Sequence, residues 1–135
     1  MNKLLCIVSV ILCIFLVACT NNTTTKSDEG EKVMFKQITP EEAKKIMNSG
    51  EEHIILDTRE QSEFDEGHIP GAILIPYTEI ETKAEQMLPD KNAQILVYCR
   101  SGRRSKIASE SLTNLGYTNV KEFGGIIDWP YEVAK

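Results

Sequence analysis

The chain has 135 residues, of which 41% are hydrophobic and 26% are charged, and its formal net charge is -5 at pH 7. These values are ordinary for a soluble globular protein and leave room for one domain. Nucleic-acid binding proteins usually carry a basic face, so the acidic balance excludes that class, and any anion site must be local.

The amino-terminal segment departs from this average. Lys3 precedes a run of apolar and small residues over 4–17, which leads into Leu16-Val17-Ala18-Cys19. A spanning helix needs about 20 residues, so the run is short for an uncleaved anchor but fits the hydrophobic region of a secretion signal. The tetrapeptide resembles the lipobox of bacterial lipoproteins. That resemblance implies a signal peptide at 1–18, lipid on Cys19, and an extracytoplasmic domain anchored to the bacterial cell membrane.

The chain has four cysteines. Cys6 and Cys13 would leave with the signal peptide, and lipid would block Cys19, so Cys99 is the one thiol expected in the mature protein. Cysteines in an oxidising compartment usually pair. A single remaining thiol is therefore either reactive or buried in the core.

Residues 19–32 are polar after the expected lipid site and include no large apolar side chain. Such a segment cannot bury itself, so we expect a flexible spacer there. The remaining residues, 33–135, are enough for one compact domain.

Helical patterns alternate with short apolar runs in this domain. The first helix should begin after Thr39 as N-cap, with Pro40 at its first position and Glu42 completing a capping box, and Gly50 should end it. Apolar residues at helical spacing predict two more helices, over 80–88 before Pro89 and over 108–115 before Gly116.

The apolar runs are short enough to be buried strands. They lie at 53–57, 72–75, 94–98 and 120–123. Alternating strands and helices predict an α/β fold with three layers, in which helices cover both faces of a mainly parallel sheet. Sites in such sheets lie at the carboxyl ends of the strands, where Cys99 follows the run 94–98.

The residues after this strand suit a reactive thiol. They read Cys99, Arg100, Ser101, Gly102, Arg103, Arg104 and Ser105, and the next helix should begin near Arg104 or Ser105. A helix N-terminus and nearby guanidinium groups stabilise a thiolate. Glycine permits the curvature that turns backbone N–H groups inward, and arginine binds oxyanions in a bidentate manner. This setting argues against an inert core cysteine.

The pattern Cys-x-x-Gly-x-Arg-Ser between a strand and a helix resembles the rhodanese family, and more closely its single-domain thiosulfate sulfurtransferases. The likeness extends over most of the domain. It includes the segments 56–60 with Phe64, 67–72, and 116–117 with Val120, Gly124, Gly125 and Trp129.

The resemblance implies sulfur transfer through a persulfide on Cys99. The donor would be thiosulfate or a similar anion, and the acceptor a thiol, cyanide or a protein. Backbone N–H groups from Arg100 to Arg104 would hold the anion, and Arg100 or Arg103 would bind the oxyanion end of the donor. Arg104 is expected to brace the loop. We expect a monomer that needs no metal and no organic cofactor.

Asp57 and His68 could suggest a catalytic Cys-His-Asp triad with the thiol. We instead expect structural roles. Asp57 ends a strand, where carboxylates commonly accept hydrogen bonds from backbone N–H groups. Arg59 could form an ion pair with Asp57, Glu60 or Glu63. His68 lies in a turn.

Two other functions remain open. Phosphatases and arsenate reductases of the same fold have one residue more between Cys and Arg than the four that separate Cys99 from Arg104. A shorter ring of N–H groups suits a sulfur atom better than a phosphate. The second alternative is an interaction module or a persulfide relay that hands sulfur to a protein partner.

Overall fold

The computed structural model describes residues 32–135. The predicted signal peptide, Cys19 and the spacer up to residue 31 lie outside the described residues. No helix within 32–135 is long and apolar enough to cross a membrane.

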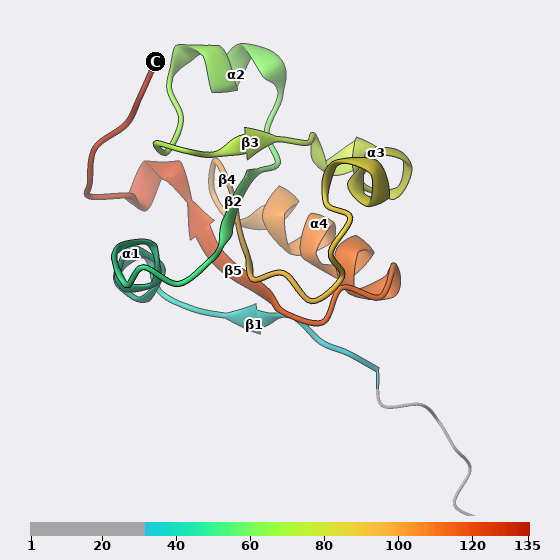
Figure 1. Ribbon diagram of the computed structural model, residues 1–135. Helices are drawn as coiled ribbons and strands as arrows, with labels where there is room; N and C mark the ends of the chain where they lie inside the picture. The colour runs from blue at the N-terminus through green and yellow to red at the C-terminus, as the bar shows by residue number, and fades with distance from the viewer. Residues whose placement is uncertain (1–31) are drawn as a thin grey trace, which may run out of the picture. The chain divides into compact units, whose positions relative to one another are not determined.

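A five-stranded sheet forms the centre of the domain (Figure 1). Its strands are β1 (Lys36–Gln37), β2 (Ile54–Asp57), β3 (Ile73–Leu74), β4 (Ile95–Cys99) and β5 (Val120–Gly125). The order is β1-β5-β4-β2-β3, and every neighbouring pair is parallel. All five residues of the central strand β4 are buried. The predicted parallel α/β architecture is confirmed.

Helices cover both faces of the sheet (Figure 1). They are α1 (Pro40–Asn48), α2 (Gln61–Glu66), α3 (Ile80–Met87) and α4 (Arg103–Asn114), with 3-10 turns η1 (Tyr77–Glu79) and η2 (Ile126–Asp128). Side chains alternate along β4, so Val97 packs in the cluster with α3 and α4 while Tyr98 packs in the cluster with α1 and Trp129.

Local signals define the first helix as predicted. The Glu42 backbone N–H donates to Thr39 Oγ1 at 3.1 Å, and the Thr39 N–H donates to Glu42 Oε2 at 2.8 Å. Gly50 follows the C-cap with φ +81°, a conformation that glycine adopts without strain. The capping box and the end at Gly50 are therefore confirmed.

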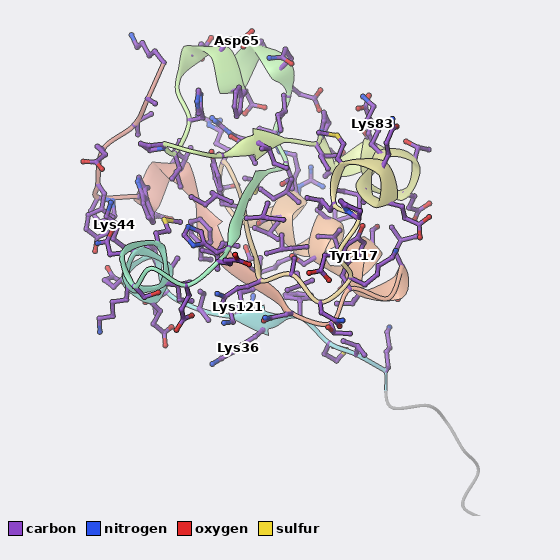
Figure 2. The ribbon with its side chains drawn as sticks, viewed as in Figure 1. Lys36, Lys44, Asp65, Lys83, Tyr117 and Lys121 are labelled. Atoms are coloured by element: carbon purple, nitrogen blue, oxygen red, sulfur yellow. The ribbon has the colours of Figure 1, made fainter. Side chains whose placement is uncertain are left out.

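Tyr117 lies in the core cluster between the sheet and the helices α3 and α4. Its ring is buried, and its hydroxyl donates to the Leu88 carbonyl at 2.7 Å. Figure 2 shows Tyr117 inside the domain, whereas Lys44, Asp65 and Lys83 lie around the outside.

Two elements were not expected from the sequence. The helix α2 contains no buried residue and β1 is only two exposed residues long, so neither produces an apolar periodicity. Several boundaries also differ from the predicted ones by one residue or two. Among them, Cys99 is the last residue of β4 because it pairs with Gly125 of β5, and α4 begins at Arg103.

A buried ion pair holds the segment after β2. Arg59 Nη2 lies 2.7 Å from Asp57 Oδ2, and both side chains are almost fully buried. The Tyr98 hydroxyl donates to the same carboxylate at 2.6 Å and accepts the Ile69 N–H at 3.1 Å. Burial raises the pKa of Tyr98, and the Asp57 charge raises it further, so the phenol stays protonated and donates.

We predict that Asp57→Ala lowers the free energy of unfolding by about 3–5 kcal/mol, because it leaves the Arg59 charge buried without its partner. Glu79→Ala is the matched control, since it breaks the exposed Glu79–Lys83 pair, whose loss costs about 0–1 kcal/mol. Urea unfolding of the purified protein measures both. Equal losses in the two variants would contradict the structural role of Asp57.

Candidate active site

Cys99 lies where the carboxyl end of β4 meets the amino end of α4. The two elements are separated by Arg100, Ser101 and Gly102. Cys99 is fully buried, and it is a free thiol. The sulfur therefore sits beneath the loop at the edge of the sheet where the ligand site of an open α/β sheet is found.

Hydrogen-bond donors surround the sulfur. The Gly102 backbone N–H donates to Cys99 Sγ across 3.0 Å. Burial alone raises the pKa of the Cys99 thiol, but hydrogen bonds from the Ser105 hydroxyl and from the N–H groups of Ser105, Gly102 and Ser101 outweigh it, so the pKa is lowered. The site therefore favours a thiolate, the nucleophilic form of cysteine.

Two glycines give the loop its shape. Gly102 has φ +101° at the N-cap of α4, a conformation that side chains rarely permit. A Cβ on Gly125 would lie 2.0 Å from the Arg100 carbonyl oxygen, so β5 can approach the loop only without a side chain there. The Ile127 N–H donates to the same carbonyl at 3.2 Å and fixes it from η2.

Arg104 points to α2 and forms a bidentate ion pair with Glu63. Its Nη1 lies 2.7 Å from Oε2, and its Nη2 lies 2.8 Å from Oε1. The Arg104 guanidinium holds the pKa of Glu63 at about 2, so the carboxylate stays ionised at neutral pH. Both terminal nitrogens of Arg104 are therefore occupied within the protein.

Arg100 and Arg103 are exposed, and neither forms an ion pair with any residue of 32–135. The Arg103 guanidinium lies 6.0 Å above the centre of the Tyr77 ring, a geometry that permits a cation–π interaction. These two guanidinium groups are the cations beside Cys99 that remain available for an anionic ligand.

Asp57, Arg59 and His68 have other partners. Arg59 binds Asp57 and also donates to the Gly67 carbonyl at 2.7 Å. The His68 ring stacks on Phe64 with 3.8 Å between centroids, and its Nδ1 lies 2.9 Å from the Phe64 carbonyl. Asp57 and His68, which could have suggested a triad with Cys99, therefore interact with other groups near α2.

Three polar residues at the site were not assigned from the sequence. Ser105 belongs to the quoted motif, but its hydroxyl was given no role. Glu63 comes from α2, a helix without an apolar pattern, and Glu122 lies in β5. An acidic residue inside a predicted buried strand was the signal that could have identified Glu122.

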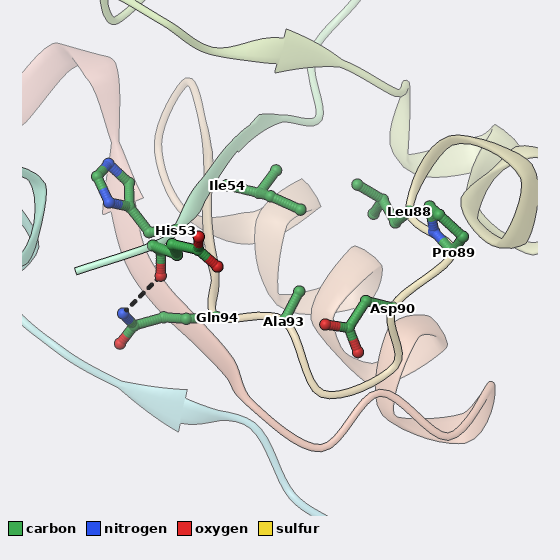
Figure 3. A pocket seen from close by; sticks show the side chains of 8 residues that line it. His53, Ile54, Leu88, Pro89, Asp90, Ala93 and Gln94 are labelled. Carbon is green, nitrogen blue, oxygen red and sulfur yellow. Dashed lines mark hydrogen bonds between the residues drawn. The ribbon is translucent and has the colours of Figure 1, made fainter.

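One hollow of the domain lies away from this loop. It encloses about 490 Å³ at the amino ends of β2 and β4, the opposite end of β4 from Cys99, and Figure 3 shows Ile54, Leu88 and Asp90 around it. A second hollow of about 280 Å³ lies beside the loop, where Ser101, Gly102 and Glu122 line it.

The arrangement suits anionic sulfur chemistry. It combines a thiol with a lowered pKa, N–H groups directed at the sulfur and two arginines that form no ion pair within the described part of the chain. Preorganised N–H donors stabilise negative charge as it develops during a reaction. The site can therefore generate a nucleophilic sulfur and hold an anion formed on it.

Comparisons with known proteins agree with this geometry. The Escherichia coli (strain K12) thiosulfate sulfurtransferase PspE is 42% identical over 73 residues, which cover 54% of this chain and 70% of that protein. The putative sulfur carrier protein YrkF of Bacillus subtilis (strain 168) is 36% identical over 94 residues, and the match covers 69% of this chain but half of YrkF.

Solved structures of related proteins also resemble this chain. The structure described as a rhodanese with anions from E. coli superimposes with a TM-score of 0.58 at 36% identity, and the match covers 62% of this chain and 98% of that one. The family model for the rhodanese-like domain matches residues 39–130. The chain belongs to the rhodanese-like domain family.

Proposed function

We propose that this protein is a sulfurtransferase that moves a sulfane sulfur from thiosulfate or a similar anion to a thiophilic acceptor through a persulfide on Cys99. The observation that carries the proposal is the Cys99 thiol, whose pKa is lowered by the hydrogen bonds of its loop. The sulfurtransferase names of related proteins support the reaction class.

In the first half-reaction, the Cys99 thiolate attacks the outer sulfur of thiosulfate. A bond forms between the two sulfur atoms, the bond to the sulfonate sulfur breaks, and its electron pair leaves with sulfite. The terminal sulfur of the new persulfide carries the negative charge. The N–H donors around Cys99 stabilise this anion as they stabilise the thiolate.

In the second half-reaction, an acceptor such as cyanide attacks the terminal sulfur. The S–S bond breaks, thiocyanate leaves, and the electron pair returns to Cys99 as a thiolate. The cycle needs no metal or organic cofactor, because every step is a displacement at sulfur.

Arg100 and Arg103 are the proposed ligands for the oxyanion end of the donor. Both are exposed, whereas Glu63 holds the two terminal nitrogens of Arg104. Because Cys99 is fully buried, the donor reaches the sulfur only when the atoms that cover it move.

A persulfide relay is the second candidate function. One relative is named a putative sulfur carrier protein, and an anion-stabilising loop serves a relay as well as an enzyme. A relay would form the persulfide but turn over slowly with cyanide or small thiols. A thiosulfate–cyanide assay separates the two.

We also propose that the protein is a lipoprotein held on the outer side of the bacterial cell membrane through Cys19. The support is the sequence alone: a charged start, an apolar run over 4–17 and the lipobox-like Leu16-Val17-Ala18-Cys19.

The first prediction from the proposed function concerns the persulfide. After incubation with thiosulfate, the Cys99 peptide should gain the mass of one sulfur atom and lose it on addition of cyanide. Cys99→Ser should abolish both changes, because a hydroxyl stays protonated at neutral pH and cannot hold a sulfane sulfur. Mass spectrometry of the digested protein measures the change.

Aryl phosphate hydrolysis is the control for this experiment. The parent protein should hydrolyse these esters negligibly. Robust hydrolysis that depends on Cys99, with no gain of sulfur mass, would show that the proposed reaction is wrong and that the phosphatase alternative is right.

The second prediction identifies the donor ligand. Arg103→Ala or Arg100→Ala should raise the KM for thiosulfate about tenfold or more, because a hydrogen bond to a charged group contributes about 1.5–3 kcal/mol. Steady-state kinetics measures the change. Lys45→Ala, which removes an exposed charge from α1, is the control and should leave KM unchanged. Unchanged KM in both arginine variants would remove them from the donor site.

The third prediction tests the anchor. Expressed in a bacterium, the parent protein should fractionate with membranes and incorporate labelled lipid, and Cys19→Ser should abolish the labelling while sulfur transfer continues. Recovery of the parent protein in the soluble fraction, cleaved after residue 18 and without lipid, would refute the lipoprotein proposal.

A further inference from the structure

Glu63 of α2 binds one of the three arginines around the Cys99 loop. Arg100 and Arg103 are exposed, whereas the Arg104 side chain is 18% exposed and lies against the Glu63 carboxylate. Its two terminal nitrogens contact different carboxylate oxygens, at 2.7 Å and 2.8 Å. Arginine binds phosphate in the same bidentate geometry. Glu63 therefore holds the position that an oxyanion from solution would take on Arg104.

Arg104 directly follows the N–H groups that surround the sulfur. Gly102, whose N–H donates to Cys99 Sγ at 3.0 Å, is the N-cap of α4, and Arg104 is the second residue of that helix. Two residues of chain span at most about 7 Å, so the Arg104 side chain starts close to the group that contacts the sulfur. A guanidinium released from Glu63 would therefore add a cation to the place where an anion binds.

The partial burial of Arg104 makes it depend on an anionic partner. The Glu63 side chain is 25% exposed, so the ion pair is largely shielded from water. Removing one member of such a pair leaves the other charge without compensation. The Arg104 guanidinium holds the pKa of Glu63 at about 2, so the carboxylate is ionised at neutral pH and competes there with any other anion. Without that carboxylate, an oxyanion from solution is the available replacement.

The helix α2 has attachments to the domain that do not involve Glu63. At its carboxyl end, Arg59 donates to the Gly67 carbonyl at 2.7 Å. His68 donates to the Ala134 carbonyl at 2.9 Å and accepts from the Ala134 N–H at 2.8 Å. Loss of the Glu63 carboxylate should therefore leave α2 in place, and its effect on anion binding can be measured separately.

We propose that Glu63 is a specificity-determining residue, which keeps Arg104 away from oxyanions that carry no sulfane sulfur, such as inorganic phosphate. This role rests on the proposed function, in which a sulfur donor reaches Cys99 through the same anion site. Weak binding of phosphate leaves that site free for the donor.

The shapes of the two anions explain the selection. Thiosulfate reacts with its outer sulfur directed at Cys99, so only the oxygens of its other end face arginine side chains. Phosphate has an oxygen at every corner and therefore gains more from a third guanidinium close to the N–H groups. Discrimination by withholding a contact from the competitor is a general means of specificity.

The test measures how inorganic phosphate protects Cys99 from iodoacetamide in the full chain, at neutral pH and constant ionic strength. Mass spectrometry of the Cys99 peptide gives the phosphate concentration for half protection. Glu63→Gln should lower this concentration about tenfold or more, because the phosphate gains charge-assisted hydrogen bonds from Arg104. The glutamine oxygen can still accept the Glu60 N–H, which Glu63 accepts at 3.0 Å at the start of α2.

Glu66→Gln is the matched control. It removes an equal charge from the same helix, at an exposed residue that forms no ion pair within residues 32–135, and should change phosphate protection much less. An equal gain in Glu63→Gln and Glu66→Gln would overturn the proposal, because net charge alone would then explain it. No gain in Glu63→Gln would overturn it as well, since a purely structural role predicts a loosened loop and no tighter binding.

A double variant identifies the cation responsible. Arg104→Ala combined with Glu63→Gln should lose the gain in phosphate protection, because no guanidinium is then released. A gain of the same size in this double variant would show that Glu63 acts through another group and would contradict the proposal.

A second measurement uses the parent protein, in case a Glu63 variant fails to fold. With isotope-labelled arginine, nuclear magnetic resonance follows the guanidinium N–H signals at the phosphate concentration that half protects Cys99. Those of Arg100 and Arg103 should shift, and those of Arg104 should stay unchanged, because Glu63 occupies its two terminal nitrogens. A parallel shift of the Arg104 signals would refute the proposal.

Neither measurement uses a sulfur donor, so failure of sulfur transfer is a separate outcome. In the thiosulfate–cyanide assay, the inhibition constant of phosphate should fall in Glu63→Gln by a larger factor than the KM for thiosulfate. An equal fall of both constants would show that Glu63 weakens the binding of all anions alike, and selection between them would be disproved.

Discussion

The close approach of β5 to the Cys99 loop is the constraint on which the site depends. Between Gly125 and the Arg100 carbonyl there is no room for a side chain, and the bulge in β5 brings the strand to that position. With the carbonyl held there, the following N–H groups turn toward the sulfur, and Gly102 N–H reaches it at 3.0 Å. The anion-stabilising property of the loop is thus a consequence of how two parallel strands end side by side.

Two arginines of this region form ion pairs with carboxylates, and two form none within the described residues. Asp57 binds Arg59, and Glu63 binds Arg104, so these guanidinium groups stabilise the fold around α2 and the start of α4. Arg100 and Arg103 are exposed and have no such partner among the described residues. A protein with net charge -5 can therefore present a small cationic surface at one place, beside a single sulfur atom.

Opposing effects also act on the charge of the Cys99 sulfur beneath the loop. Burial disfavours a thiolate at Cys99, and the hydrogen bonds of the loop favour it. A second acidic side chain, Glu122 of β5, is also buried in this part of the domain. Its carboxylate accepts a hydrogen bond from the Ser105 hydroxyl at 2.6 Å, which connects β5 to the first turn of α4.

Local patterns in the sequence determined much of this protein. The capping box at Thr39, the apolar runs and the glycine-containing loop after Cys99 predicted the parallel α/β fold and the place of the thiol, because each depends on neighbours close along the chain. The partner of Arg104, the bulge in β5 and the burial of Glu122 depended on the tertiary structure. Residues 41 positions apart, such as Glu63 and Arg104, meet only when separate elements pack, and no periodicity records which carboxylate a given arginine will bind.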